Sequence, residues 1–112
     1  MLYVLSDGTI RLTRGDTARL IVPIVNRIPG QEEVPYTIKS TDILELSIKK
    51  SVKDDDSLVH KEIVGSNIFH ILPTDTKNLS FGKYVYDVQL TTDNDIYTVV
   101  EPSTFEIMKE VT

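Results

Sequence analysis

Two histidines are the residues of this chain best suited to binding a metal or to moving a proton near neutral pH. His60 and His70 lie in two strand-like segments that are joined by Gly65-Ser66, a pair typical of two-residue hairpin turns. In such a hairpin the register places the two rings on opposite faces, which argues against a shared metal site. A slip of one residue would bring them to the same face, so a metal pair stays open as the minor alternative.

Acidic residues gather in two turn-like segments, Asp54-Asp55-Asp56 and Asp93-x-Asp95, and oxygen-rich loops are what calcium requires. The first segment lacks both the glycine and the closing glutamate of an EF-hand loop. Solvated surface loops are therefore the favoured interpretation. A weak calcium site built from two adjacent loops is the alternative.

No pattern in the sequence predicts an enzyme. The chain has no cysteine, no Gly-x-Ser-x-Gly elbow, no His-Glu-x-x-His helix and no glycine-rich phosphate loop. We therefore assign no catalytic, cofactor-binding or metal-binding residue. Tyr36, Tyr97 and Phe81 are suited to an aromatic platform for a sugar, although packing in the core or at its rim is the stronger interpretation. Arg14-Gly15-Asp16 spells an integrin-binding triplet, but its position between two strands predicts an ordinary turn.

Charge and composition exclude several further classes. The chain has 112 residues and a formal net charge of −5, without a basic cluster, so binding to nucleic acid is not expected. The apolar start, residues 1–5, is too short for a secretion signal or a membrane span, which predicts a cytoplasmic site of synthesis and no membrane partner. Without cysteine, the fold must be stabilised by its interior alone. We predict one domain over residues 1–112.

The elements that must position all these residues are strands. Apolar residues alternate with polar ones in segment after segment, and no window shows the 3.6-residue period of an amphipathic helix. Turn residues separate the segments about every ten residues, which predicts an all-β fold, an antiparallel two-sheet β-sandwich of seven to nine strands. The clearest inward-facing sets are Leu44, Leu46 and Ile48; Tyr84, Tyr86, Val88 and Leu90; and Phe105 and Ile107.

Two local patterns refine this prediction. Leu79, Gly82 and Tyr84 are spaced as in a tyrosine corner, in which the tyrosine hydroxyl bonds to the backbone a few residues upstream. This corner predicts an immunoglobulin-like topology. Pro23 interrupts an alternating segment, and proline inside a strand marks a sheet edge or a bulge. Together with Ile21 and Val25, which share its outward parity, it predicts an edge or apolar patch open to a partner.

Four segments in this order resemble small β-sandwich proteins encoded by phages and prophages of Gram-positive bacteria. The group is similar to the N-terminal domain of phage baseplate upper proteins, an immunoglobulin-like module that docks into the virion. The third segment is the most specific of the four. The segments are Ile10-x-Leu12-x-Arg14-Gly15-Asp16-Thr17, Asp42-x-Leu44-x-Leu46-x-Ile48-Lys49-Lys50, Pro73-x-Asp75-Thr76-x-x-Leu79-x-x-Gly82-x-Tyr84-x-Tyr86-Asp87-Val88-Gln89-Leu90, and Thr98-Val99-Val100-x-Pro102-x-x-Phe105-x-Ile107.

The resemblance implies a non-enzymatic virion component of the tail, baseplate or head, with other virion proteins as partners in a homo- or hetero-oligomer. Such a protein is made in the cytoplasm of the bacterial host and ends in the virion. A full baseplate upper protein continues into a linker and a distal region, whereas this chain ends at Thr112, so a docking or decoration module is expected. The second hypothesis is a carbohydrate- or receptor-binding sandwich that uses the acidic loops, with or without calcium.

Overall fold

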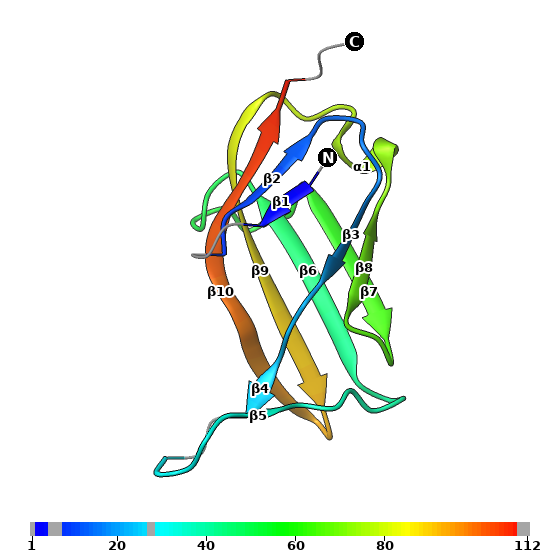
Figure 1. The fold of residues 1–112 in the computed structure, drawn as a ribbon. Coiled ribbons are helices and arrows are strands. Elements are labelled where there is room, and N and C mark those ends of the chain that lie inside the picture. The colour runs from blue at the N-terminus through cyan, green and yellow to red at the C-terminus, as the bar shows by residue number, and fades with distance from the viewer. Residues whose placement is uncertain (1, 5–7, 27–28, 110–112) are drawn as a thin grey trace.

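The computed structural model describes residues 2–4, 8–26 and 29–109, which form ten strands and one short helix (Figure 1). The all-β class predicted from the sequence is confirmed. The elements are β1 (Leu2–Val4), β2 (Ile10–Thr13), β3 (Ala18–Ile21), β4 (Val25–Asn26), β5 (Val34–Pro35), β6 (Ile43–Lys49), β7 (Val59–Val64), β8 (Ile68–Ile71), α1 (Pro73–Thr76), β9 (Gly82–Thr92) and β10 (Asp95–Met108).

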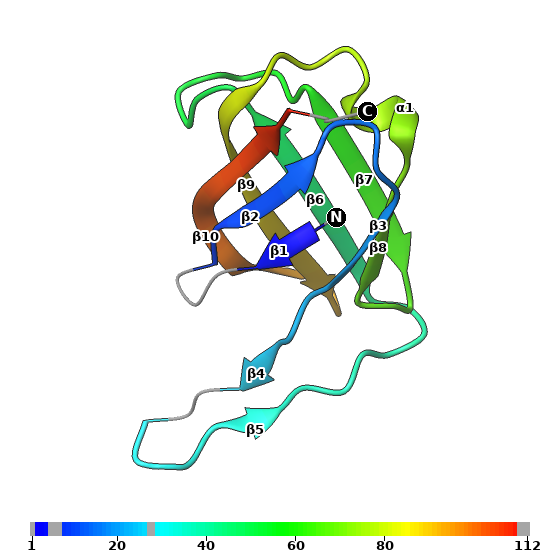
Figure 2. The same cartoon turned by 45° about the horizontal axis from the view of Figure 1, so that its top comes forward.

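Six of the strands form one curled sheet in the order β1-β2-β10-β9-β6-β7 (Figures 1 and 2). Its pairs are antiparallel except for β2 and β10, which run parallel. The expectation of a wholly antiparallel arrangement is therefore wrong at this pair. The remaining strands form two small antiparallel sheets, β3–β8 and β4–β5. The described residues thus contain ten strands, against the seven to nine expected, because the sequence does not predict the short strands β1, β4 and β5, whereas β10 joins two predicted strands.

The core lies between the large sheet and the β3–β8 pair. Leu20 from β3 and Phe69 from β8 belong to the same buried cluster as Leu44 and Phe105 of the large sheet. The three inward-facing sets predicted from alternation are all buried, which confirms the predicted faces of β6, β9 and the end of β10. Tyr86 and Phe105 meet edge to face across β9 and β10, with their ring centres 6.0 Å apart.

The hairpin predicted around Gly65-Ser66 is wrong. β7 pairs with β6, and β8 pairs with β3, so the two segments belong to different sheets. Backbone hydrogen bonds to other parts of the chain fix the crossing between the sheets. The amide of Gly65 donates to the carbonyl of Asp42 at 2.8 Å, and the amide of Val22 donates to the carbonyl of Asn67 at 2.9 Å.

The last strand is longer than predicted. The sequence indicates two strands separated by Glu101-Pro102-Ser103, whereas β10 continues through this segment with register shifts against β9 between Thr98 and Ser103. Bulges absorb the irregularity, and Pro102 is accommodated because β2 pairs with β10 only from Phe105 onward.

A narrow arm, formed by β4, β5 and the residues near them, projects from the body (Figures 1 and 2). The Cα radius of gyration is 14.7 Å, and the molecule measures 48 × 27 × 26 Å. A compact domain of this length would have a radius of about 13 Å. The excess agrees with the projecting arm.

Candidate functional site

An open groove of about 680 Å³ separates the base of the arm from the end of the β9–β10 hairpin. Residues 23–26 line its arm side. Tyr36 and Lys39, from the segment that connects β5 to β6, line it as well. The opposite wall includes Asp93 from the hairpin turn and Tyr97 from β10. The groove is therefore built from three segments that are far apart in the sequence.

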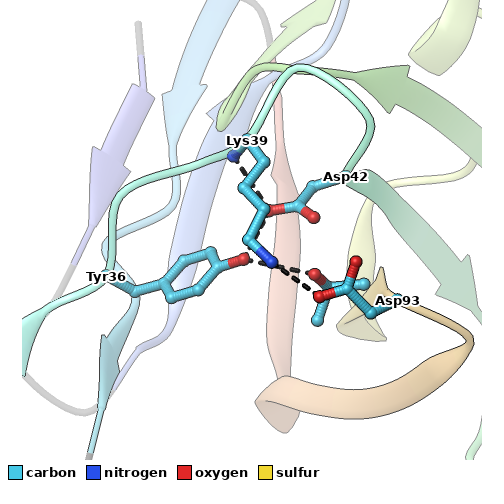
Figure 3. Close-up of polar contacts among 5 residues, drawn as sticks. Tyr36, Lys39, Asp42 and Asp93 are labelled. Atoms are coloured by element: carbon cyan, nitrogen blue, oxygen red, sulfur yellow. Dashed lines mark hydrogen bonds and ion pairs between the residues drawn. The ribbon is translucent and has the colours of Figure 1, made fainter.

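The buried carboxylate of Asp42 holds the connecting segment in place beside the groove (Figure 3). Its Oδ2 atom accepts a hydrogen bond from the Tyr36 hydroxyl at 2.5 Å and another from the Lys39 amide at 3.0 Å. The Asp42 amide donates in return to the Lys39 carbonyl at 3.1 Å and closes a turn. The Tyr36 oxygen also lies 3.4 Å from Thr92 Oγ1 on β9. Thr92 therefore lies within reach of both the Tyr36 hydroxyl and the Asp42 carboxylate.

These hydrogen bonds set the protonation state of Asp42. Burial raises the pKa of its carboxyl group, but the neighbouring Thr92 and Tyr36 hydroxyls, the Lys39 amide and the Lys39 charge outweigh this effect, so the pKa lies below its ordinary value. Asp42 is therefore a buried anion. Its Oδ1 atom is buried without a hydrogen-bond partner among residues 2–4, 8–26 and 29–109.

An ion pair joins the two sides of the groove. Lys39 Nζ lies 2.6 Å from Oδ2 of Asp93 in the turn between β9 and β10 (Figure 3). This hydrogen bond and the charge of Asp93 raise the pKa of Lys39 above its ordinary value. Both side chains are more than half exposed, so water and salt screen the pair and it contributes little to stability. Its effect is to neutralise the lysine inside the groove.

The predicted aromatic platform is only partly assembled. Tyr36 and Tyr97 line the same groove, which reaches Leu90 and Thr92 at the far end of β9, whereas Phe81 directly precedes the start of that strand. Leu90 is nine positions along the chain from Phe81, a distance of roughly 30 Å in an extended strand. Phe81 contacts Arg14 instead, with the guanidinium carbon 4.2 Å from the ring centre.

Arg14-Gly15-Asp16 forms a turn, as the sequence predicted. The Asp16 amide donates to the Thr13 carbonyl at 3.1 Å, and Gly15 has a φ of 84°. The Gly15 amide donates to Oγ1 of Thr76 in α1 at 3.0 Å, and Thr76 is fully buried. This turn therefore packs against α1, and Arg14 lies over Phe81.

The three residues of the predicted corner lie where β9 begins. The Tyr84 hydroxyl donates to the Ser80 carbonyl at 2.8 Å, four residues upstream, which is the hydrogen bond expected of a tyrosine corner. Leu79 packs against the core, and Gly82 has a φ of 134°, a conformation that L-residues rarely adopt.

The residues of the predicted interaction edge are all exposed. Ile21 is 61% and Val25 is 44% exposed, and Pro23 lies between the two strands to which they belong. Ile21 is opposite Ile68 on β8, and Val25 is opposite Pro35 on β5. We name these five residues the apolar strip. It runs from the β3–β8 pair onto the arm.

The two histidines lie in different sheets. His60 is opposite Ser47 on β6, with Nε2 3.4 Å from Oε2 of Glu45, and His70 is opposite Arg19 on β3. The register deduced from a hairpin is therefore wrong, because the two strands do not pair with each other.

The two acidic segments lie at opposite ends of the large sheet. Lys49, which precedes the Asp54–Asp56 loop, pairs with Val85 near the start of β9, whereas Asp93 follows its end. The alternative of a calcium site between two adjacent loops is therefore wrong. Over the described ranges, no three His, Asp or Glu side chains are grouped so that they could hold a metal ion.

Sequence reasoning missed Lys39 and Asp42 as parts of a site. The run Lys39-Ser40-Thr41-Asp42 before an apolar strand is a local signal for a turn, and the structure contains that turn. No local pattern pairs Lys39 with Asp93, because that contact depends on how distant strands are arranged.

Comparison with known proteins adds no assignment: no family model, curated protein or solved structure matches the chain. In the part of the chain that the structure describes, no helix has the length and apolar character needed to cross a membrane.

Proposed function

We propose that this protein is a non-enzymatic assembly module of a phage virion, in the tail, baseplate or head, that acts through protein–protein contacts. The observation that carries the proposal is the apolar strip. Its exposed apolar side chains extend from the β3–β8 pair onto the arm and include Ile21, Pro23 and Val25. Exposed apolar surface on a short, open sheet edge is typical of a protein interface.

An immunoglobulin-like sandwich is the fold that we propose for this module. The neighbours β6, β9 and β10 have the order of strands C, F and G, and β7 lies beside β6 as strand C′ does. The pair β3–β8 corresponds to strands B and E, and the tyrosine corner lies at the start of β9, the counterpart of strand F. These correspondences support the resemblance to baseplate modules stated above.

In this proposal the partners are other virion proteins, in a homo- or hetero-oligomer, and neither nucleic acid nor a membrane takes part. The protein is made in the bacterial host cytoplasm and ends in the virion. The net charge of −5 supports the exclusion of nucleic acid, since a phosphate backbone requires a basic surface.

Light scattering across a concentration series tests the proposal. We expect a defined oligomer for the natural chain and a monomer for the double variant Ile21→Asp/Val25→Asp, because two carboxylates would be desolvated in the interface. Val52→Asp is the matched control, since Val52 is 60% exposed and lies outside the apolar strip. It should assemble like the natural chain.

A hetero-oligomer requires a second measurement. The tagged chain should co-purify with phage particles released by the strain that encodes it, and the double variant should be absent from them. A chain that is monomeric at every concentration and missing from the particles would contradict the proposal.

A further inference from the structure

The groove beside the arm presents two tyrosine rings, one on each side. Tyr36 is partly buried, and its hydroxyl is engaged by Asp42, so the ring is held in one orientation. Tyr97 is 52% exposed on β10. A fixed ring and an exposed ring in one groove provide apolar surface for a flat, partly apolar ligand.

Carboxylates supply the hydrogen-bond acceptors around these rings. Asp95 and Glu101 line the groove, and neither forms an ion pair within residues 2–4, 8–26 and 29–109. Lys39, by contrast, is neutralised by Asp93. The groove therefore carries net negative charge and two carboxylate acceptors without an ion-pair partner, beside neutral donors on Asn26, Tyr97 and Thr98. It suits a ligand that brings hydroxyl groups, and it repels phosphates, sulfates and acidic sugars.

We propose that this groove binds a short neutral oligosaccharide. The sugar rings pack against Tyr97 and Tyr36, and their hydroxyl groups donate to Asp95 and Glu101. The volume of about 680 Å³ is within the range of small-molecule sites, about 300–1,000 Å³. This activity goes beyond the assembly role and does not depend on it. In this proposal the sugar binds away from the Asp54–Asp56 loop, and its binding does not require calcium.

An array of neutral oligosaccharides, with sialylated counterparts of the same sugars, is the first experiment. Hits are then titrated by calorimetry against the natural chain and against Tyr97→Ala. We expect Tyr97→Ala to weaken binding by at least about tenfold, which corresponds to roughly 1.4 kcal/mol. Tyr97 is more than half exposed, so this variant should fold normally.

Two controls separate the groove from the rest of the surface. Ile96→Ala changes the neighbour of Tyr97 in the sequence, whose side chain is 67% exposed and does not line the groove. Asp54→Asn changes an exposed carboxylate at the opposite end of the sheet. Both should bind like the natural chain, whereas Glu101→Gln, which removes an acceptor charge, should bind more weakly.

The proposal is overturned if no neutral oligosaccharide binds at millimolar concentration. It is equally overturned if Tyr97→Ala binds as tightly as the natural chain, or if sialylated sugars bind better than their neutral counterparts. Pro23 and Val25 belong to both the apolar strip and the wall of the groove, but Tyr97 does not belong to the strip, so failure of this experiment leaves the light-scattering test of assembly unaffected.

Discussion

Tyr84 and Tyr36 are both partly or fully buried tyrosines, and each uses its hydroxyl to fix a connection outside the strands. Tyr84 holds the approach to β9 through Ser80, and Tyr36 holds the approach to β6 through Asp42. In both cases the partly buried hydroxyl is satisfied by a hydrogen bond that also holds a connecting segment. The two hydroxyls therefore contribute to stability in ways that can be measured separately.

Tyr84→Phe should keep the fold and lower the free energy of unfolding by about 1 kcal/mol, the usual net value of one hydrogen bond. The ring stays buried, so only the bond to Ser80 is lost. Urea denaturation gives the value. Tyr97→Phe is the control, because the Tyr97 side chain is exposed. An unchanged midpoint for Tyr84→Phe would remove the corner as a stabilising feature.

Asp42 should make the protein sensitive to acid. Its pKa is lower in the folded protein than in the unfolded chain, so the unfolded state binds the proton first and stability falls as the pH falls. The contribution of Asp42 is complete above the unfolded pKa of about 4 and is lost as the pH drops toward the folded value. Comparing urea midpoints of the natural chain and Asp42→Asn from pH 7 to pH 3 measures it.

Asp42→Asn should be the less stable protein at pH 7, and the difference between the two proteins should shrink below about pH 4. Other carboxylates titrate in both proteins and cancel in the difference. A difference that does not change with pH would show that Asp42 is not a stabilising anion.

The crossing from β7 to β8 depends on Gly65. Its φ is 70°, and a Cβ atom there would lie 3.1 Å from the Ser40 carbonyl oxygen, against the turn that holds Asp42. Gly65→Ala therefore adds a steric contact to the cost of the left-handed conformation, which is about 1–2 kcal/mol. Gly30→Ala is the matched control, since Gly30 has a φ of 81° and open space around it.

We expect Gly65→Ala to lower the thermal unfolding midpoint and Gly30→Ala to lower it less. The difference between the two isolates the contact with the turn at Ser40. Equal midpoints for the two variants would mean that this turn moves aside without cost.

Alternation predicted the faces of single strands well and their partners poorly. The buried parity of β6 and β9 can be deduced from Leu44 and Tyr84 onward, because it depends on each strand alone. The pairing of β7 with β6 rather than with β8 cannot be deduced in this way. It depends on backbone hydrogen bonds that join Gly65 and Asn67 to segments far away in the sequence. A glycine followed by serine favours a tight hairpin and a change of sheet equally well.

The candidate site follows the same rule. Tyr36 and Tyr97 can be singled out from the sequence as aromatic residues, but their common groove depends on the arm and the β9–β10 hairpin being neighbours. Phe81 is the counterexample: it is also aromatic, but it lies at the other end of β9, beside Arg14.

The molecule as a whole divides into a body with a continuous core and an arm outside it. None of the residues from 29 to 35 belongs to the core cluster or packs against it, whereas Ile24 and Tyr36, at the base of the arm, do. β4 and β5 pair over only two residues each, and their side chains are exposed. The arm therefore has few contacts that would resist local opening.

Native-state hydrogen exchange, followed by NMR, should separate these two parts. We expect the amides of Leu44 and Val88, which lie in neighbouring central strands, to exchange only through global unfolding. Amides of the arm should exchange much faster, and their rates should not change in Tyr84→Phe, whose effect is confined to the body.

If the arm is an interface, assembly should slow the exchange of its amides, while the exchange rates of Leu44 and Val88 stay governed by global stability. Arm amides as slow as those of β6 in a dilute monomer would contradict this division, because they would show that the arm unfolds only together with the body.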